Sequence, residues 1–178
     1  MDHINHYMNR RTIIVGDVNS GKTSYTLNIL ELFLKAGHAG KIAILDLAPD
    51  NIKRIGGKME LPQDESLLYL TTSILAPRLT GKDEYHTLTL AKKNATAIEK
   101  LFTKFFLQKR EILFVNDATL YFQAGDFDRF IKILDASSTQ IINAYYGHTF
   151  SDSGLTRREK NLTEKLMKLC DQIIEMPL

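Results

Sequence analysis

The stretch that decides the fold of this chain reads Gly16-Asp17-Val18-Asn19-Ser20-Gly21-Lys22-Thr23. It fits the spacing G-x-x-x-x-G-K-[ST] at every fixed position. The short apolar run 12–15 precedes this octet, and a helical pattern follows it over residues 24–36. This is the order of strand, loop and helix in which such a spacing binds phosphate, so the octet predicts a phosphate-binding loop.

The residue types of the loop suit that chemistry. Gly16 and Gly21 permit backbone conformations in which successive N–H groups converge on phosphate oxygens. The start of the helix, including Ser24, adds unpaired N–H groups and a favourable dipole. We expect Lys22 to reach the terminal phosphates and Thr23 to be a ligand of Mg²⁺. Every residue of the octet is a candidate for nucleotide binding.

Composition limits the other possibilities. With 178 residues and ordinary apolar and charged fractions, the chain is expected to form one domain, residues 1–178. A net charge of +2 does not by itself indicate nucleic acid or membrane. The single Cys170 excludes an internal disulfide framework, and no apolar run is long enough to span a membrane. The polar residues 1–10 are expected to be a mobile tail rather than a signal peptide, so the sequence predicts a cytoplasmic protein.

Apolar runs alternate with helical patterns along the chain. We expect five buried parallel strands and four helices, which predicts an α/β protein, a three-layer α/β/α sandwich around a mostly parallel sheet of five or six strands. The expected strands are 12–15, 42–47, 112–115, 141–144 and 172–176, with a possible edge strand at 67–70. The expected helices are 23–35, whose apolar face holds Leu27, Leu30 and Leu34, then 86–110, 126–134 and 156–169.

The segment 48–85 is the least regular part of the sequence. It leaves the second strand at its C-terminal end, so it should begin on the same rim of the sheet as the phosphate-binding loop. Substrate contacts are therefore expected here. Arg54, Lys58 and Arg78 are its charged candidates.

A second catalytic element is expected at the end of the strand Ile112-Leu113-Phe114-Val115, which continues with Asn116-Asp117. This run resembles the Walker B strand of P-loop NTPases, and the order of strands resembles the additional-strand, RecA-like ATPases. The resemblance implies a P-loop NTPase fold with ATP and Mg²⁺ as cofactors. In one register Asp117 is the acid that holds the metal. In the other, Asn116 replaces that acid and Asp117 stands where a Glu polarises water, which predicts slow or conditional hydrolysis.

Two further sites follow from the same resemblance. The strand ending in Asn143, Tyr145 and Tyr146 is where the family places a polar sensor of the γ-phosphate. Arg157 and Arg158 could stabilise phosphoryl charge, from the same chain or from a neighbouring subunit of an oligomer.

A second family resemblance concerns polynucleotide 5′-hydroxyl kinases. The chain shares with them the segments 19–23, Leu45-Asp46-Leu47, Ala76-Pro77-Arg78 and Val115-Asn116. The resemblance implies that Asp46 activates the accepting hydroxyl. The chain departs from the family in two ways, since Ala48 replaces its second Asp and its lid pattern of two Arg residues four apart is missing.

Three functions therefore remain open. The first is a Mg²⁺-dependent ATP-binding protein, a weak or partner-stimulated ATPase. The second is a kinase for a polynucleotide or small-molecule hydroxyl, with Asp46 as base. The third is a nucleotide switch that binds nucleic acid or a protein through the region between Arg78 and Arg110, which holds eight Lys or Arg and three acidic residues. No guanine-reading Asn-Lys-x-Asp occurs, which favours ATP over GTP.

Overall fold

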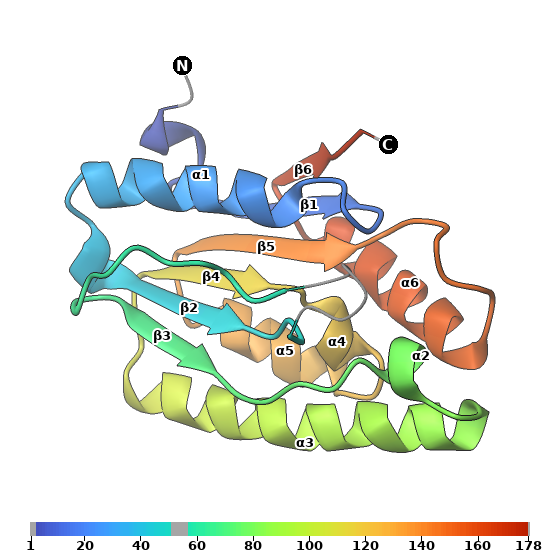
Figure 1. Ribbon diagram of the computed structural model, residues 1–178. Helices are drawn as coiled ribbons and strands as arrows, with labels where there is room; N and C mark the ends of the chain where they lie inside the picture. The colour runs from blue at the N-terminus through green and yellow to red at the C-terminus, as the bar shows by residue number, and fades with distance from the viewer. Residues whose placement is uncertain (1–2, 51–56, 178) are drawn as a thin grey trace.

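The computed structural model describes residues 3–50 and 57–177, and its centre is a six-stranded sheet in which every pair of neighbours is parallel (Figure 1). The strand order is β3-β2-β4-β5-β1-β6. This confirms the predicted α/β class, with the edge strand as the sixth. The strands are β1 (Arg11–Gly16), β2 (Ile42–Asp46), β3 (Leu68–Thr71), β4 (Ile112–Asn116), β5 (Thr139–Tyr145) and β6 (Gln172–Glu175).

Three of the helices, α3, α5 and α6, begin at a side-chain cap that the sequence provides. The side chains of Asp83, Asp126 and Ser153 each accept a hydrogen bond from a backbone N–H in the first turn of the helix that follows. Two single-turn helices, α2 and α4, were not predicted. The α-helices are α1 (Lys22–Lys35), α2 (Pro77–Thr80), α3 (Glu84–Leu107), α4 (Thr119–Phe122), α5 (Phe127–Leu134) and α6 (Gly154–Met167), and short 3₁₀ turns are η1 (Ile4–His6) and η2 (Ala39–Lys41).

Two hydrophobic clusters lie on opposite faces of the sheet. Figure 1 shows α1 over one face and α3, α4 and α5 over the other, with α6 beside them at the end where α2 lies. On the α1 face, Ile14, Ile44 and Phe114 pack with Phe33. On the other face, alternate residues of the same strands pack against the long helix α3. Strands covered on both sides need apolar residues throughout, which explains their continuous apolar runs.

The N-terminal residues correct one expectation. Residues 3–10 are not a mobile tail, because η1 is followed by Tyr7, whose side chain is 1% exposed. Tyr7 belongs to the cluster on the α1 face, and its hydroxyl lies 3.5 Å from that of Tyr25 in α1. Tyr7 therefore anchors the polar segment, together with Ile4 and Met8, which pack against the same cluster.

The apolar face of α1 also differs from the expectation. Its buried residues are Thr26, Ile29, Leu30 and Phe33, whereas Leu27 and Leu34 are only partly buried. The face is turned by about one residue because Thr26 packs inward at the end of β5, where its hydroxyl accepts a hydrogen bond from Asn143.

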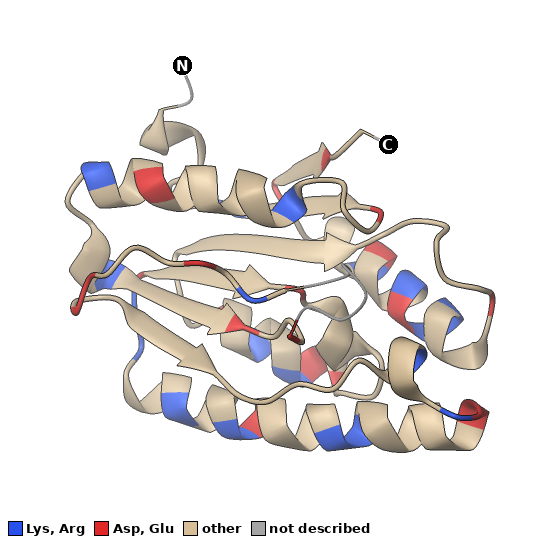
Figure 2. Cartoon of the chain, viewed as in Figure 1, with Lys and Arg blue, Asp and Glu red and all other residues tan. Residues whose placement is uncertain are grey.

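The long helix α3 carries most of its basic residues outward. Figure 2 shows Lys and Arg positions along its length, interrupted by acidic ones. Lys92, Lys93 and Lys100 line a shallow groove there together with the exposed Tyr85. Within the part of the chain that the structure describes, neither α3 nor any other helix combines the length and hydropathy needed to cross a bilayer.

Candidate functional site

A cavity of about 380 Å³ opens at the edge of the sheet where the strands end. Parallel strands place their carboxyl ends together, so the residues that follow β1, β2 and β4 meet here with the end of β5. Its walls are formed by residues 18–24 from the predicted phosphate-binding loop, by Ala48, Pro49 and Gly57, by the α2 segment 76–79, and by polar side chains of β4, α4 and β5.

The 16–23 loop has the backbone shape expected of an anion site. Asn19 and Gly21 adopt positive φ angles of 55° and 88°, which turn the chain into α1. The helix start has no side-chain cap. None of the N–H groups of Lys22, Thr23 and Ser24 donates a hydrogen bond to another group among the described residues. Three N–H groups at the wall of a cavity are thus available to a ligand.

Lys22 lies in this loop with its side chain folded onto the backbone. Its Nζ donates to the carbonyl of Asp17 at 2.5 Å and lies 3.4 Å from Oγ of Ser20. Burial lowers the pKa of Lys22, and the charges of Asp117 and Asp17 oppose that change. Among the residues that the structure describes, Lys22 has no direct carboxylate partner, so a cation is held where phosphate is expected.

The carboxylate of Asp17 is occupied by contacts within the protein, and the nucleotide contact expected of this loop residue stays a prediction. Its carboxylate accepts hydrogen bonds from the N–H of Val18 and of His148 and from the hydroxyl of Thr149, at 2.6–2.9 Å. Burial raises the pKa of Asp17, but these hydrogen bonds outweigh it and the pKa is lowered. The side chain is thus directed to the loop after β5. A Cβ on Gly147 would lie 2.4 Å from Cγ of Asp17, so this approach requires glycine.

The second register of the Walker B-like strand fits the geometry better. Asn116 is the last residue of β4, and its Oδ1 lies 3.5 Å from the hydroxyl of Thr23. The same oxygen accepts a hydrogen bond from Nδ2 of Asn143 at 2.9 Å. An amide therefore stands opposite Thr23, where the first register required the carboxylate of Asp117.

Asp117 also lines the cavity and has an unusual backbone conformation. Its φ of 58° is held by Asn143, whose side-chain oxygen accepts from the Asp117 N–H at 2.7 Å and whose carbonyl accepts from the next N–H at 3.0 Å. Oδ1 of Asp117 accepts from the Thr119 hydroxyl. Burial raises the pKa of Asp117, although Thr119, Lys22 and Arg78 act in the opposite direction. A carboxylate with a raised pKa is suited to accept a proton.

Asp46 does not have the environment of a catalytic base. Its side chain is fully buried, and its two oxygens accept hydrogen bonds from Met59 N–H at 2.7 Å, Asn116 Nδ2 at 2.8 Å, Tyr69 Oη at 2.9 Å and Ala48 N–H at 3.3 Å. Four donors occupy the lone pairs that a base would use. This carboxylate instead holds β2, β3 and β4 together behind the cavity.

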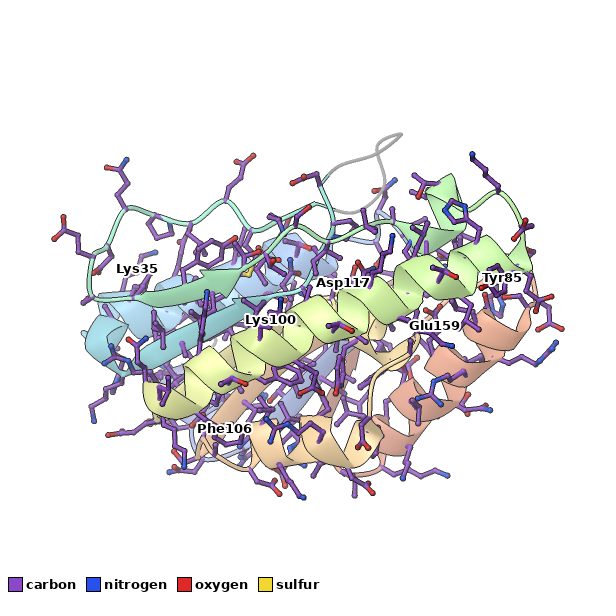
Figure 3. The ribbon with its side chains drawn as sticks, turned by 90° about the horizontal axis from the view of Figure 1, so that it is seen from below. Lys35, Tyr85, Lys100, Phe106, Asp117 and Glu159 are labelled. Atoms are coloured by element: carbon purple, nitrogen blue, oxygen red, sulfur yellow. The ribbon has the colours of Figure 1, made fainter. Side chains whose placement is uncertain are left out.

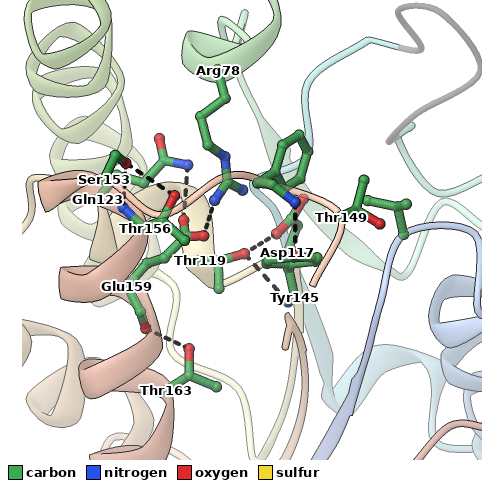
Figure 4. A network of polar contacts seen from close by, with 12 residues as sticks. Arg78, Asp117, Thr119, Gln123, Tyr145, Thr149, Ser153, Thr156, Glu159 and Thr163 are labelled. Atoms are coloured by element: carbon green, nitrogen blue, oxygen red, sulfur yellow. Dashed lines mark hydrogen bonds and ion pairs between the residues drawn. The ribbon is translucent and has the colours of Figure 1, made fainter. Parts of the chain in front are cut away.

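An arginine enters the cavity from the irregular segment. Arg78, on α2, forms an ion pair with the buried Glu159 of α6, and its guanidinium lies 3.7 Å from the ring centroid of Phe150 (Figure 4). Nε2 of Gln123 donates to the other oxygen of Glu159 at 3.0 Å. Figure 3, seen from the α3 side, shows Glu159 near the end of α3 that carries Tyr85, whereas Lys35 and Phe106 lie at the opposite end.

The other Arg and Lys side chains that were predicted as site residues either do not line this cavity or lie outside the described residues. Arg157 is exposed and pairs with Asp152, and Arg158 donates to the carbonyls of Phe122 and Gly125. Nζ of Lys58 donates to three oxygens that follow β2 and β3. Arg54 lies outside the described residues.

The candidates for a γ-phosphate sensor are reduced by the geometry. Asn143 and Tyr145 line the cavity, but the hydroxyl of Tyr146 donates to Glu164 at 2.8 Å, away from it. The amide of Asn143 is already used by Asn116, Thr26 and the Asp117 N–H. Tyr145 thus remains, although its hydroxyl accepts from Phe150 N–H at 3.3 Å.

The described residues contain no group of three His, Cys, Asp or Glu side chains placed to hold a metal ion. A Mg²⁺ ion in this cavity would therefore depend on Thr23, on phosphate oxygens and on Asp117 or water. Such a set suits Mg²⁺, which keeps most of its waters and takes one or two protein oxygens. The sequence matches no known protein-family profile and no curated protein.

Proposed function

We propose that this chain is a Mg²⁺-dependent ATP-binding protein with a weak or partner-stimulated ATPase activity. One observation carries the proposal: the uncapped start of α1 presents the N–H groups of Lys22, Thr23 and Ser24 at a cavity that also holds the Lys22 ammonium. Unpaired N–H groups, a helix dipole and a cation attract the same ligand, a phosphate chain.

The sheet order supports the same proposal. β5 lies between β1, which leads into the loop, and β4, which ends at Asn116. An inserted strand at this place is the arrangement expected from the resemblance to additional-strand ATPases. It separates the loop from Asp117 by the width of one strand, which leaves room for a terminal phosphate and an attacking water.

The polar residues have distinct roles in this proposal. Lys22 and the loop N–H groups bind the phosphates, and the Thr23 hydroxyl holds Mg²⁺, which when bound neutralises charge on the phosphate oxygens. Asp117 orients the attacking water through the oxygen that Thr119 leaves free, and accepts its proton. Asn116 adds no negative charge beside Thr23, so the metal is held loosely and hydrolysis is slow.

A kinase is the second candidate, and a second cavity favours it. This cavity, about 610 Å³, shares Arg78, Gln123 and Phe150 with the first and extends along the start of α6. An acceptor bound there would lie next to the terminal phosphate. Because four donors surround Asp46, Asp117 is the base that the geometry favours for such a transfer.

The test uses calorimetry and labelled nucleotide. We expect ATP with Mg²⁺ to bind the wild-type chain and Lys22→Ala to lose binding by at least about tenfold, because charge-assisted hydrogen bonds to phosphate are removed. Lys35→Ala is the matched control, since Lys35 is exposed at the far end of the same helix and pairs only with Glu31. Equal ATP affinity in the wild type and Lys22→Ala would contradict the proposed site.

The fate of the γ-phosphate separates the two activities. Label released as inorganic phosphate indicates an ATPase, and a partner that accelerates the release would be identified in the same assay. Label transferred to a 5′-hydroxyl oligonucleotide or a small alcohol would indicate the kinase. If the label stays on ATP under all these conditions, both activities are refuted and only ATP binding remains as the function of the site.

A further inference from the structure

Arg78 has hydrogen-bonding capacity that the protein does not use. A guanidinium has five N–H donors, yet among the described residues Arg78 donates to Glu159 alone. Its flat face lies against the ring of Phe150, and its Cζ is 5.1 Å from the centroid of the Tyr145 ring. Stacking fixes the plane of the group and leaves the edges free, and Arg78 lines the same cavity as Lys22.

The partner of Arg78 is held from two sides. Glu159 is 1% exposed; one oxygen faces Arg78 and the other accepts from Nε2 of Gln123. If Arg78 moved away, a charged Glu159 would remain buried without a counter-charge, which is strongly unfavourable. Departure of the arginine therefore requires that Glu159 become neutral.

The structure also contains an acceptor for that proton. Gln123 is 1% exposed, and its Oε1 is a buried oxygen that has no hydrogen-bond partner in residues 3–50 and 57–177. A protonated carboxyl facing a carboxamide can form two hydrogen bonds at once, since the amide N–H donates to one carboxyl oxygen and the carboxyl O–H donates to the amide oxygen. The first of these bonds already exists, and the unpaired Oε1 is available for the second.

We propose that Arg78 binds the terminal phosphate of the nucleotide, and that Glu159, released by Arg78, takes one proton from solvent and donates it in a hydrogen bond to Oε1 of Gln123. This inference rests on the proposed ATP site and adds a positioning residue to it. No covalent bond changes. One ion pair is exchanged for another, and one solvent proton is bound per exchange.

The surrounding charges agree with this exchange. Glu159 faces Arg78 on α2 and Gln123, which directly follows α4. Asp117 after β4 and Tyr145 of β5 act on it from farther away. Burial raises the pKa of Glu159 to about 7 although Arg78 and Gln123 lower it, and Asp117 adds to the increase. Loss of Arg78 removes a lowering cause, so the pKa rises further. Proton uptake is thus expected above about pH 7, where Glu159 is ionised before nucleotide binds.

The first experiment compares ATP with ADP, both with Mg²⁺. Because only ATP carries the terminal phosphate, Arg78→Ala should lower the preference for ATP over ADP by about tenfold or more and leave ADP affinity unchanged. Arg157→Ala, which removes an exposed arginine paired with Asp152, is the matched control and should keep the preference. A preference unchanged in Arg78→Ala would overturn the proposal.

The second experiment measures protons. Titration of ATP at about pH 8 in two buffers of different ionisation enthalpy should show uptake of a large fraction of one proton for the wild type. ADP binding should show almost none. Glu159→Gln has the shape needed for the hydrogen bond to Gln123 but cannot titrate, so the proton uptake should disappear. In this variant the ATP affinity should also no longer weaken as the pH rises above about 7.

The outcomes separate the two levels of inference. Failure of the wild type to bind ATP would overturn the proposed function and this inference together. Tight ATP binding with equal proton counts in the wild type and Glu159→Gln would overturn only the exchange. Urea unfolding of each variant shows whether it is folded, and a variant that is unfolded is replaced by Arg78→Lys or Glu159→Met, for which the same results are expected.

Discussion

Replacement of Asp46 distinguishes a structural carboxylate from a catalytic base. In Asp46→Ala, four donors lose their acceptor. The hydroxyl of Tyr69 can turn to water, because this residue is 37% exposed, and the bond from Ala48 is long at 3.3 Å. The N–H of Met59 is buried and loses its acceptor, and the buried amide of Asn116 keeps only a long bond of 3.4 Å to the carbonyl of Gly57.

The cost follows from these two donors. A buried donor left without an acceptor costs about 1–3 kcal/mol, so the two cost roughly 2–6 kcal/mol, and we expect about 4 kcal/mol. Asp46→Asn keeps one acceptor oxygen and should cost about half as much. Either value is a large fraction of the roughly 5–15 kcal/mol by which a domain is stable.

Urea unfolding followed by circular dichroism measures the effect. Glu65→Ala, which removes an exposed carboxylate in the same irregular segment, is the control and should unfold like the wild type. We expect the midpoint of Asp46→Asn to fall while any phosphate release per folded molecule persists. An Asp46→Asn protein with wild-type stability, wild-type ATP affinity and no phosphoryl transfer would refute the reasoning and restore Asp46 as a base.

Three further predictions concern stability. Asn116→Asp places a carboxylate 2.8 Å from that of Asp46, so the free energy of unfolding should fall by about 3 kcal/mol without nucleotide, and Mg²⁺ with ATP should restore part of it; equal stability in urea would contradict this. Because folding raises the pKa of Glu159 from 4.5 to about 7, the folded state binds more protons in that window, and stability should fall by roughly 3 kcal/mol as the pH rises through it. Glu159→Gln should flatten that slope in urea titrations, and a slope equal to the wild type would exclude Glu159 as its source. Tyr7→Ala should cost about 3–5 kcal/mol and lower the melting temperature, whereas a dispensable tail would leave it unchanged.

The sequence predicted the central strands well because β1, β2, β4 and β5 are buried on both faces and are therefore apolar along almost their whole length. The edge strands β3 and β6 are only partly buried. Residues 112–115 and 141–144, for example, form the interior of β4 and β5. The single-turn helices α2 and α4 were missed because four residues show no helical period. Tyr7 was missed because one aromatic side chain in a polar segment has no local pattern.

Predictions for the site likewise succeeded where the signal is local in the sequence and failed where it depends on residues far apart. The 16–23 loop was found because its chemistry is contained in eight consecutive residues. The pairing of Arg78 with Glu159 joins residues 81 positions apart, and only the folded chain shows it. Arg157 and Arg158 were candidates because the family resemblance implies arginines that stabilise phosphoryl charge, and the sequence contains no signal for the direction in which their side chains point. A buried Glu in a helix that also has exposed positions, as with Glu159 in α6, gives no sequence signal either, and neither does the buried Gln123 that follows α4.

The position of β1 determines when the phosphate-binding loop can form during synthesis. β1 lies between β5 and β6, so its two neighbours are made from Thr139–Tyr145 and Gln172–Glu175. Asp17 likewise takes hydrogen bonds from residues 131 and 132 positions later. The ribosome therefore synthesises the loop among the first segments, but β5 and β6, which pair with β1, are among the last. By contrast, β2, β3 and β4 pair with one another and are all synthesised before β5. On the proposed function, nucleotide would therefore bind only a chain extended past residue 175.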